Sequence, residues 1–136
     1  MQRDVLERIA SVTAKSGTLV ISVPIEIGPP LVAKQCARGL LAMRGFGEYS
    51  TRERYRPAEM ARMLLAGANT AFPREEVTGT STDGRAVRYM GHKGFNWRAL
   101  QRMVERRFAI ERRLFSPLPV FGPLLNSQVW FVCRKR

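Results

Sequence analysis

The stretch DVLERIASVTAKSGTLVISVPIE, residues 4–26, decides the fold because its apolar spacing changes from helical to strand-like across one glycine. The helical part carries apolar residues at the i, i+4, i+7 positions of one face: Val5, Ile9 and Val12, with Leu6 beside them. Gly17 can adopt the positive φ that commonly follows a helix. We therefore predict a helix that ends before Gly17 and a strand that begins after it.

The predicted strand is an almost unbroken apolar run: Leu19, Val20, Ile21 and Val23. Such a run predicts a strand covered on both faces, and a helix leading into it is half of a parallel α/β unit. Ligands of open α/β sheets bind beyond the carboxyl ends of the strands. The loop at residues 25–30 is therefore a candidate site, with Glu26 as its ionisable group. The alternative is a turn in which Glu26 is solvated and the prolines supply rigidity.

The composition suits one globular domain of 136 residues with a net charge of +12, and 45% of the residues are hydrophobic. Nineteen of the 23 basic residues are arginine, and two groups are dense: Arg52, Arg54 and Arg56, then Arg102, Arg106, Arg107, Arg112 and Arg113. Scattered arginines are typical of solvated faces, whereas a nucleic-acid site requires them to gather on one surface. We expect weak, nonspecific binding of polyanions that falls as salt rises.

Two cysteines, Cys36 and Cys133, lie far apart and outside any metal-binding motif, so a metal site is not expected. Both occur in apolar stretches, where a free thiol behaves as a small hydrophobic group. We find no signal peptide and no apolar stretch long enough to insert into a membrane. These features predict a cytoplasmic protein.

The middle of the chain is predicted to form a helical insert followed by a loop. Pro29 and Pro30 open one helix that continues to about Leu41, and Pro57 opens a shorter one that reaches about Ala66. Most of residues 67–94 is predicted to form a long surface loop. Asp83-Gly84 could form the turn of a small hairpin, although its flanks hardly alternate.

The C-terminal part predicts a helix and two strands. Asn96 is a good N-cap for a helix over residues 97–107, and an edge strand with three charges follows at residues 109–115. Residues 129–133 are apolar on both faces and predict an interior strand. The Pro/Gly loop between these strands has no room for a crossover, so they must pair antiparallel. We predict a three-stranded sheet with residues 129–133 in the middle, antiparallel to both neighbours, and with Trp97 and Trp130 in the core.

Three segments resemble the C-terminal half of a class I S-adenosylmethionine-dependent methyltransferase. SGTLVISVPIE resembles its fifth strand, GHKGFNWRALQRMVERRFAIERR its last helix and sixth strand, and SPLPVFGPLLNSQVWFVCRK the connection to its antiparallel seventh strand. The resemblance implies an α/β fold: a partial Rossmann-like sheet of strands equivalent to five, seven and six. It implies one partial domain over residues 1–136, in which residues 1–28 are helix and strand, 29–94 an insert, and 95–136 a helix with a strand pair.

The chain departs from this family because it lacks the glycine-rich turn and the ribose-binding acidic residue that hold S-adenosylmethionine. The intact family uses that cofactor, but we expect none to bind this chain alone. We expect a truncated, inactive half that associates with a missing N-terminal half or with itself. The alternatives are a small basic nucleic-acid-binding protein, and a half-domain that acts only with a partner chain.

The family lines its substrate pocket with the loop after the fifth strand and the approach to the last helix. The resemblance carries these roles to Glu26, Tyr89, His92 and Lys93, and it assigns no catalytic residue. His92 is the only histidine; we interpret it as a solvated or capping residue, and a general base would require a partner and a pocket. Asn126 is expected to satisfy backbone groups of its loop.

Overall fold

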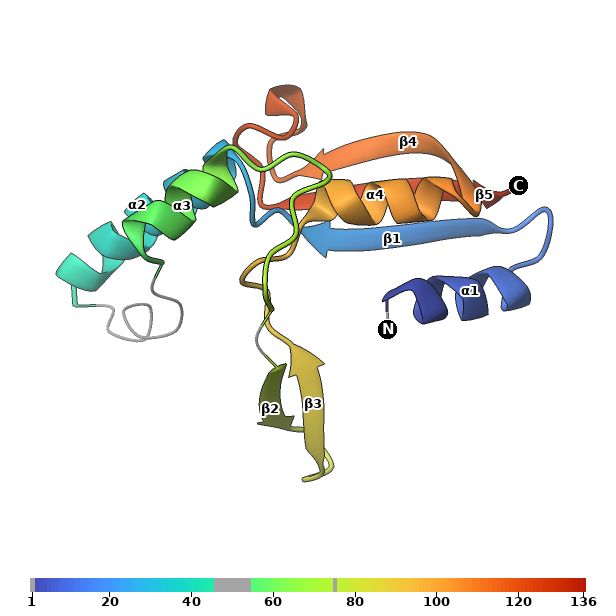
Figure 1. The fold of residues 1–136 in the computed structure, drawn as a ribbon, viewed down its shortest axis with the longest axis horizontal. Helices are drawn as coiled ribbons and strands as arrows, with labels where there is room; N and C mark the ends of the chain where they lie inside the picture. The colour runs from blue at the N-terminus through green and yellow to red at the C-terminus, as the bar shows by residue number, and fades with distance from the viewer. Residues whose placement is uncertain (1, 46–54, 75) are drawn as a thin grey trace.

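The computed structural model describes residues 2–45, 55–74 and 76–136. Its helices are α1 (Gln2–Val12), α2 (Pro29–Met43), α3 (Pro57–Leu64) and α4 (Trp97–Glu105). Its strands are β1 (Thr18–Pro24), β2 (Glu76–Thr80), β3 (Ala86–Met90), β4 (Phe108–Ser116) and β5 (Gln128–Lys135). Within these ranges the fold is mixed α/β, with a three-stranded sheet and a separate two-stranded hairpin (Figure 1).

The main sheet has the order β1-β5-β4, and β5 is antiparallel to both neighbours. Val20 lies opposite Val132 in one pair, and Leu114 lies opposite Trp130 in the other. The predicted strand order and directions are confirmed. The described sheet contains no parallel pair, so the parallel α/β unit expected around residues 4–26 is not seen within it.

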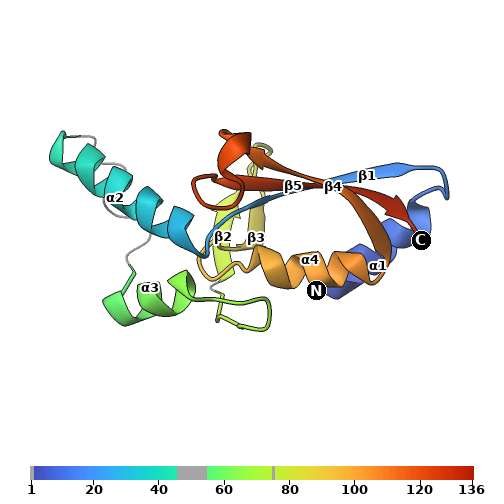
Figure 2. The same cartoon turned by 90° about the horizontal axis from the view of Figure 1, so that it is seen from above.

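Helices α1 and α4 cover one face of this sheet (Figure 2). Their apolar residues and the inward residues of the strands form the core; its fully buried members in this layer are Val104, Phe108, Val129, Phe131 and Cys133. The Trp97 ring packs edge-on against Phe115 at 6.3 Å between centroids and lies 6.5 Å from the Phe131 ring. Trp97 is therefore a core residue, as predicted.

The other face of the sheet is open in the described structure. Exposure alternates along β1 and β5, and large apolar side chains point outward: Val20 is 53% exposed, Leu114 42% and Trp130 37%. The prediction that both faces of these strands are covered is wrong here, and Trp130 is not a core residue. The outward positions of β1 also carry Thr18 and Ser22, so the strand alternates more than its apolar run suggested, and Val20 and Trp130 obscured that alternation.

Helix α1 buries a different face from the predicted one. Leu6 is buried, with Ile9 and Ala10 packed against the core, whereas Val5 and Val12 are exposed. Gly17 does not take positive φ; a Cβ at this position would lie 3.1 Å from the carbonyl oxygen of Ala14. Close approach of the backbone, rather than a left-handed conformation, therefore favours glycine there.

The predicted helices α2, α3 and α4 are confirmed. Pro29 and Pro57 occupy the first positions of α2 and α3. Asn96 caps α4: its side-chain oxygen accepts hydrogen bonds from the backbone N–H groups of Arg98 (3.0 Å) and Ala99 (3.1 Å). No helix in the described residues is both long enough and apolar enough to cross a bilayer.

The segment predicted mainly as a long loop contains the β2–β3 hairpin, so that prediction is wrong for residues 76–90. Its turn includes Gly84 at φ 79°, as the Asp83-Gly84 pair suggested. The hairpin projects away from the main sheet (Figure 1). Both of its faces are largely exposed, which explains why its sequence hardly alternates.

Candidate functional site

The loop after β1 is buried rather than solvated. Ile25 donates its backbone N–H to the carbonyl oxygen of Ser127 at 2.8 Å, and Gly28 donates to that of Met63 at 3.0 Å. Glu26 is only 5% exposed. The alternative of a solvated Glu26 is therefore wrong, and a carboxyl group lies buried at the end of β1.

Lys34 of α2 is the partner of this carboxyl group. Its ammonium lies 2.7 Å from Oε1 of Glu26 and also donates to the carbonyl oxygen of Ile25 at 3.0 Å. The second oxygen, Oε2, is buried without a hydrogen-bond partner. A buried acceptor without a donor costs about 1–3 kcal/mol, so Oε2 offsets part of the stabilisation that the Lys34 ion pair provides. Sequence reasoning missed Lys34; its signal was a lysine in the helix that follows the strand end.

Lys93 engages helix α3 instead of Glu26. Its ammonium forms an ion pair with Glu59 at 3.1 Å and lies 5.2 Å from the centre of the Tyr55 ring. Lys93 therefore lies in the wall of an open pocket with a volume of about 450 Å³. The described residues that line this pocket are Arg56, Ala58, Glu59, Arg62, Met63, Phe72, Pro73 and Lys93. The lining combines three cations and one carboxylate with apolar side chains, which suits a small ligand with an apolar body and an anionic group.

Met63 connects this pocket to the loop after β1. Its side chain is buried in the pocket lining, and its carbonyl oxygen accepts the hydrogen bond from Gly28. The structure therefore brings Lys93 to the same end of the sheet as the Glu26 loop. Tyr89 and His92 are not part of this pocket lining.

Tyr89 and His92 have other environments. Tyr89 lies on β3 opposite Val77 and is 52% exposed. His92 is exposed, and its carbonyl oxygen accepts a hydrogen bond from the N–H of Phe95 at 3.0 Å. A solvated His92 is what the sequence favoured, and the described surroundings give it no buried partner for general-base chemistry.

Two segments that sequence reasoning missed hold the pocket wall in place. Gly94 has φ 77°, and a Cβ there would lie 2.8 Å from the carbonyl oxygen of Pro73. Arg74 donates to the carbonyl oxygens of Gly91 (2.8 Å) and Met90 (3.3 Å). Burial lowers the pKa of the Arg74 guanidinium. Close packing of residues 72–74 on residues 90–95 therefore fixes the position of Lys93.

Asn126 has the structural role that the sequence predicted. It is buried, its oxygen accepts from the N–H of Leu118 at 2.6 Å, and its amide donates to the carbonyl oxygens of Leu118 and Gly122. Cys36 and Cys133 are free thiols, the first exposed and the second buried. No group of potential metal ligands occurs among the described residues.

Comparison with known proteins finds no matching family model, no matching curated protein and no matching solved structure.

Proposed function

We propose that this chain is the C-terminal, substrate-side part of an S-adenosylmethionine-dependent methyltransferase fold. The order β1-β5-β4, with an antiparallel central strand, is the order expected for strands five, seven and six of that fold. The position of α1 before β1 and α4 before β4, both on one face of the sheet, agrees with it (Figure 2).

The open face of the sheet is the observation that carries this proposal. Val20, Trp130 and Leu114 lie on adjacent strands and point away from α1 and α4. Within the described residues β1 also pairs on one side only, with β5. An apolar face next to an unpaired strand edge favours association. The proposed neighbour is a cofactor-binding half that continues the sheet beyond β1 and covers this face.

The described residues do not themselves fit S-adenosylmethionine. Gly28, which has φ 81°, is the only glycine between β1 and α2, whereas the cofactor requires a glycine-rich turn. Glu26 follows β1, the proposed fifth strand, rather than the second strand that carries the ribose-binding carboxylate in that family, so it does not replace that carboxylate. The chain alone is therefore proposed to bind no cofactor, and its contribution is the pocket between α3 and residues 72–73.

That pocket is proposed to hold the methyl acceptor. Its cations favour an acceptor with an anionic group, and Met63, Phe72 and Pro73 provide an apolar wall. Which acceptor it takes depends on groups that only the complete site would contribute.

Calorimetry tests the proposal in two stages. The chain alone should give no heat with S-adenosylmethionine, and the chain joined to the coding sequence immediately upstream, in cis or as a second polypeptide, should bind it one to one. Lys93→Met should then weaken acceptor turnover in the joined protein and leave cofactor affinity unchanged. Micromolar cofactor binding by the monomeric chain alone would contradict the proposal, as would a joined protein that does not bind the cofactor.

The same open face supports a second candidate, a half-domain that pairs with another copy of itself. Sedimentation over a wide concentration range separates the two, because self-pairing predicts a discrete dimer that Trp130→Thr dissociates. A monomer that becomes stable only with the upstream half favours the methyltransferase proposal.

A further inference from the structure

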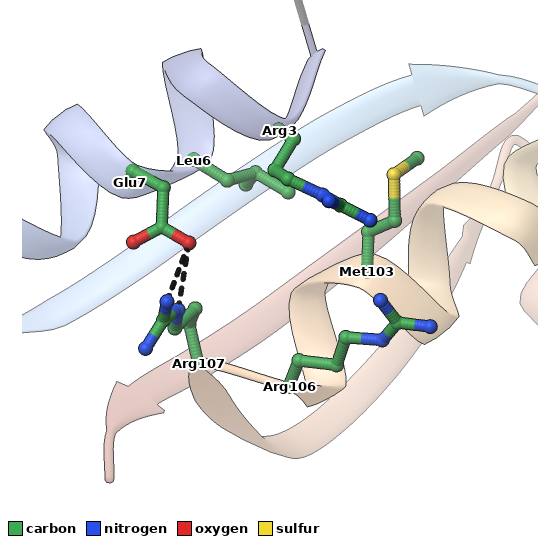
Figure 3. A pocket seen from close by; sticks show the side chains of 6 residues that line it. All are labelled: Arg3, Leu6, Glu7, Met103, Arg106 and Arg107. Carbon is green, nitrogen blue, oxygen red and sulfur yellow. Dashed lines mark hydrogen bonds and ion pairs between the residues drawn. The ribbon is translucent and has the colours of Figure 1, made fainter.

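A second pocket lies on the opposite side of the sheet from the open face, between α1 and α4. It has a volume of about 370 Å³ and is lined by Arg3, Leu6, Glu7, Met103, Arg106 and Arg107 (Figure 3). We call it the α1–α4 groove. Residues 100 positions apart meet here, so the fold gathers arginines that are scattered in the sequence.

The charges of the groove do not cancel. Glu7 is engaged by Arg107, whose Nε lies 2.8 Å and Nη2 2.7 Å from the same carboxylate oxygen. Arg102 of α4, one turn before Arg106, hydrogen-bonds to Asn69 outside the groove. No hydrogen bond or ion pair to the described residues occupies the guanidinium groups of Arg3 and Arg106, although Asp4 is adjacent to Arg3 in the chain. Arg3 and Arg106 therefore leave the lining positive after Glu7 and Arg107 are paired, although Coulombic attraction between Arg3 and the neighbouring Asp4 carboxyl offsets part of the Arg3 charge.

These two arginines line the same groove from different parts of the chain. Arg3 extends from α1 across to Met103 of α4, and the Arg106 side chain points to the same end of the pocket (Figure 3). Leu6 is buried at the base of the groove and Met103 forms an apolar side. An anion here would meet donors from two helices and an apolar surface beside them.

We propose that the α1–α4 groove binds a terminal phosphate group through Arg3 and Arg106. A guanidinium presents parallel N–H donors that match phosphate oxygens, and such charge-assisted hydrogen bonds are among the strongest in proteins. Pairing with Arg107 keeps the Glu7 carboxylate from repelling the anion. The apolar surface suits the sugar or base attached to that phosphate, in a nucleotide or at the end of a single strand. This inference is independent of the proposed methyltransferase role.

The groove must be distinguished from nonspecific attraction to a chain of net charge +12. Arg88 provides a matched control: it is an exposed arginine on β3 of the hairpin, away from the α1–α4 groove (Figure 1). Arg88→Gln changes the net charge by the same amount as Arg3→Gln or Arg106→Gln. Arg3 and Arg106 are also exposed, so all three variants should fold, which circular dichroism verifies.

The first experiment titrates the full chain with inorganic pyrophosphate at about 0.15 M salt, where screening suppresses distant charges. Saturable binding of one equivalent is expected. Arg3→Gln and Arg106→Gln should each weaken it roughly fivefold to tenfold, since each removes one charged donor at an exposed site. Arg88→Gln should stay within about twofold of the parent chain. Equal weakening by all three variants, or no saturation, would overturn the proposal.

Glu7→Gln supplies a test of opposite sign. It removes a negative charge and releases the Arg107 fork, so pyrophosphate should bind severalfold more tightly. Asp83→Asn, the matched change on the hairpin turn, should have no such effect. Weaker binding by a Glu7→Gln chain whose helical circular dichroism and urea midpoint match those of the parent, so that α1 is still docked, would contradict the arrangement of charges inferred here.

A second titration identifies the source of the phosphate. A 5′-phosphorylated single strand of about ten nucleotides is compared with the same strand bearing a 5′-hydroxyl. A preference for the phosphorylated strand over pyrophosphate, lost in Arg106→Gln, assigns the groove to nucleic-acid ends. Equal affinity for pyrophosphate and the phosphorylated strand assigns it to small phosphate esters. Identical binding of the two strands, unaffected by Arg106→Gln, would reject a terminal-phosphate site.

Discussion

Two neighbouring residues of the central strand provide a direct test of the one-sided sheet. Phe131 is fully buried against α4 and the Trp97 ring, whereas Trp130 points to the open face and is 37% exposed. Phe131→Ala removes a buried aromatic side chain and leaves a cavity, which should lower the free energy of unfolding by about 3–5 kcal/mol. Trp130→Thr keeps a residue that favours strands and loses mainly cross-strand contacts with Ser22 and Leu114. Its cost should be about 1 kcal/mol or less.

Urea unfolding followed by circular dichroism measures both values, and unchanged m-values would show that the same two states are compared. Should Phe131→Ala fail to fold, Phe131→Leu provides a milder change at the same position. Equal costs for Trp130→Thr and Phe131→Ala in a monomeric chain would refute the open face, because Trp130 would then also be buried. If a cofactor-binding half covers that face, Trp130→Thr should cost more in the joined protein than in the chain alone.

Three further predictions follow from the packing of the chain. Gly94→Ala should destabilise the chain by about 2 kcal/mol or more, because Gly94 has a positive φ and lies in close contact with Pro73. Gly39→Ala, in open space within α2, should stabilise the chain by up to about 1 kcal/mol. Equal urea midpoints for the two variants would contradict this prediction. Burial, and secondarily Glu111, raises the pKa of the Cys133 thiol to about 11, so the unfolded state ionises first and stability should fall by at most roughly 2 kcal/mol between pH 9 and 11. Cys133→Ala should lack that part of the loss, and in the folded parent a thiol reagent should modify Cys36 but not Cys133. Lys34→Met should cost more than Glu26→Gln because Glu26 is the more deeply buried partner, and the double variant should recover stability relative to Lys34→Met; additive losses in chemical denaturation would disprove the coupling.

The strand order could be predicted because it depends on local features of the chain. The short Pro/Gly loop before β5 excludes a crossover and forces an antiparallel pair. The charged run Glu111-Arg112-Arg113 indicates an edge, and an ion pair between Glu111 and Arg134 of β5 at 2.8 Å satisfies part of it. The cap at Asn96 likewise operates within one helical turn and could be recognised from its residue type.

The covered face and the site could not be predicted because both depend on tertiary partners. Thr18 and Ser22 share the face of Val20, but Val20 is itself as apolar as Ile21, and the position of α1 and α4 leaves Ile21 packed against the core and Val20 exposed. Apolar periodicity reveals a strand when one face is buried, so it could not reveal the hairpin. The partner of Glu26 comes from a different element, and the α1–α4 groove joins residues about 100 positions apart.

The groove and the open face lie on opposite sides of the same sheet, so a phosphate and a covering half can bind together. Each binds only the folded chain and adds RT ln(1 + [L]/Kd) to its stability. Phosphate binding and covering of the open face influence one another only if α1 is detached from the sheet in part of the population of the chain alone. Leu6, the Glu7–Arg107 pair and the bond from Lys135 to the Thr13 carbonyl oxygen hold α1 in place. If these contacts suffice, covering the open face leaves pyrophosphate affinity unchanged, because Arg3 is already in position. If these contacts do not suffice, covering the open face tightens pyrophosphate binding by the inverse of the fraction of chains in which α1 is docked. The ratio of the pyrophosphate affinities with and without the covering half then measures that fraction.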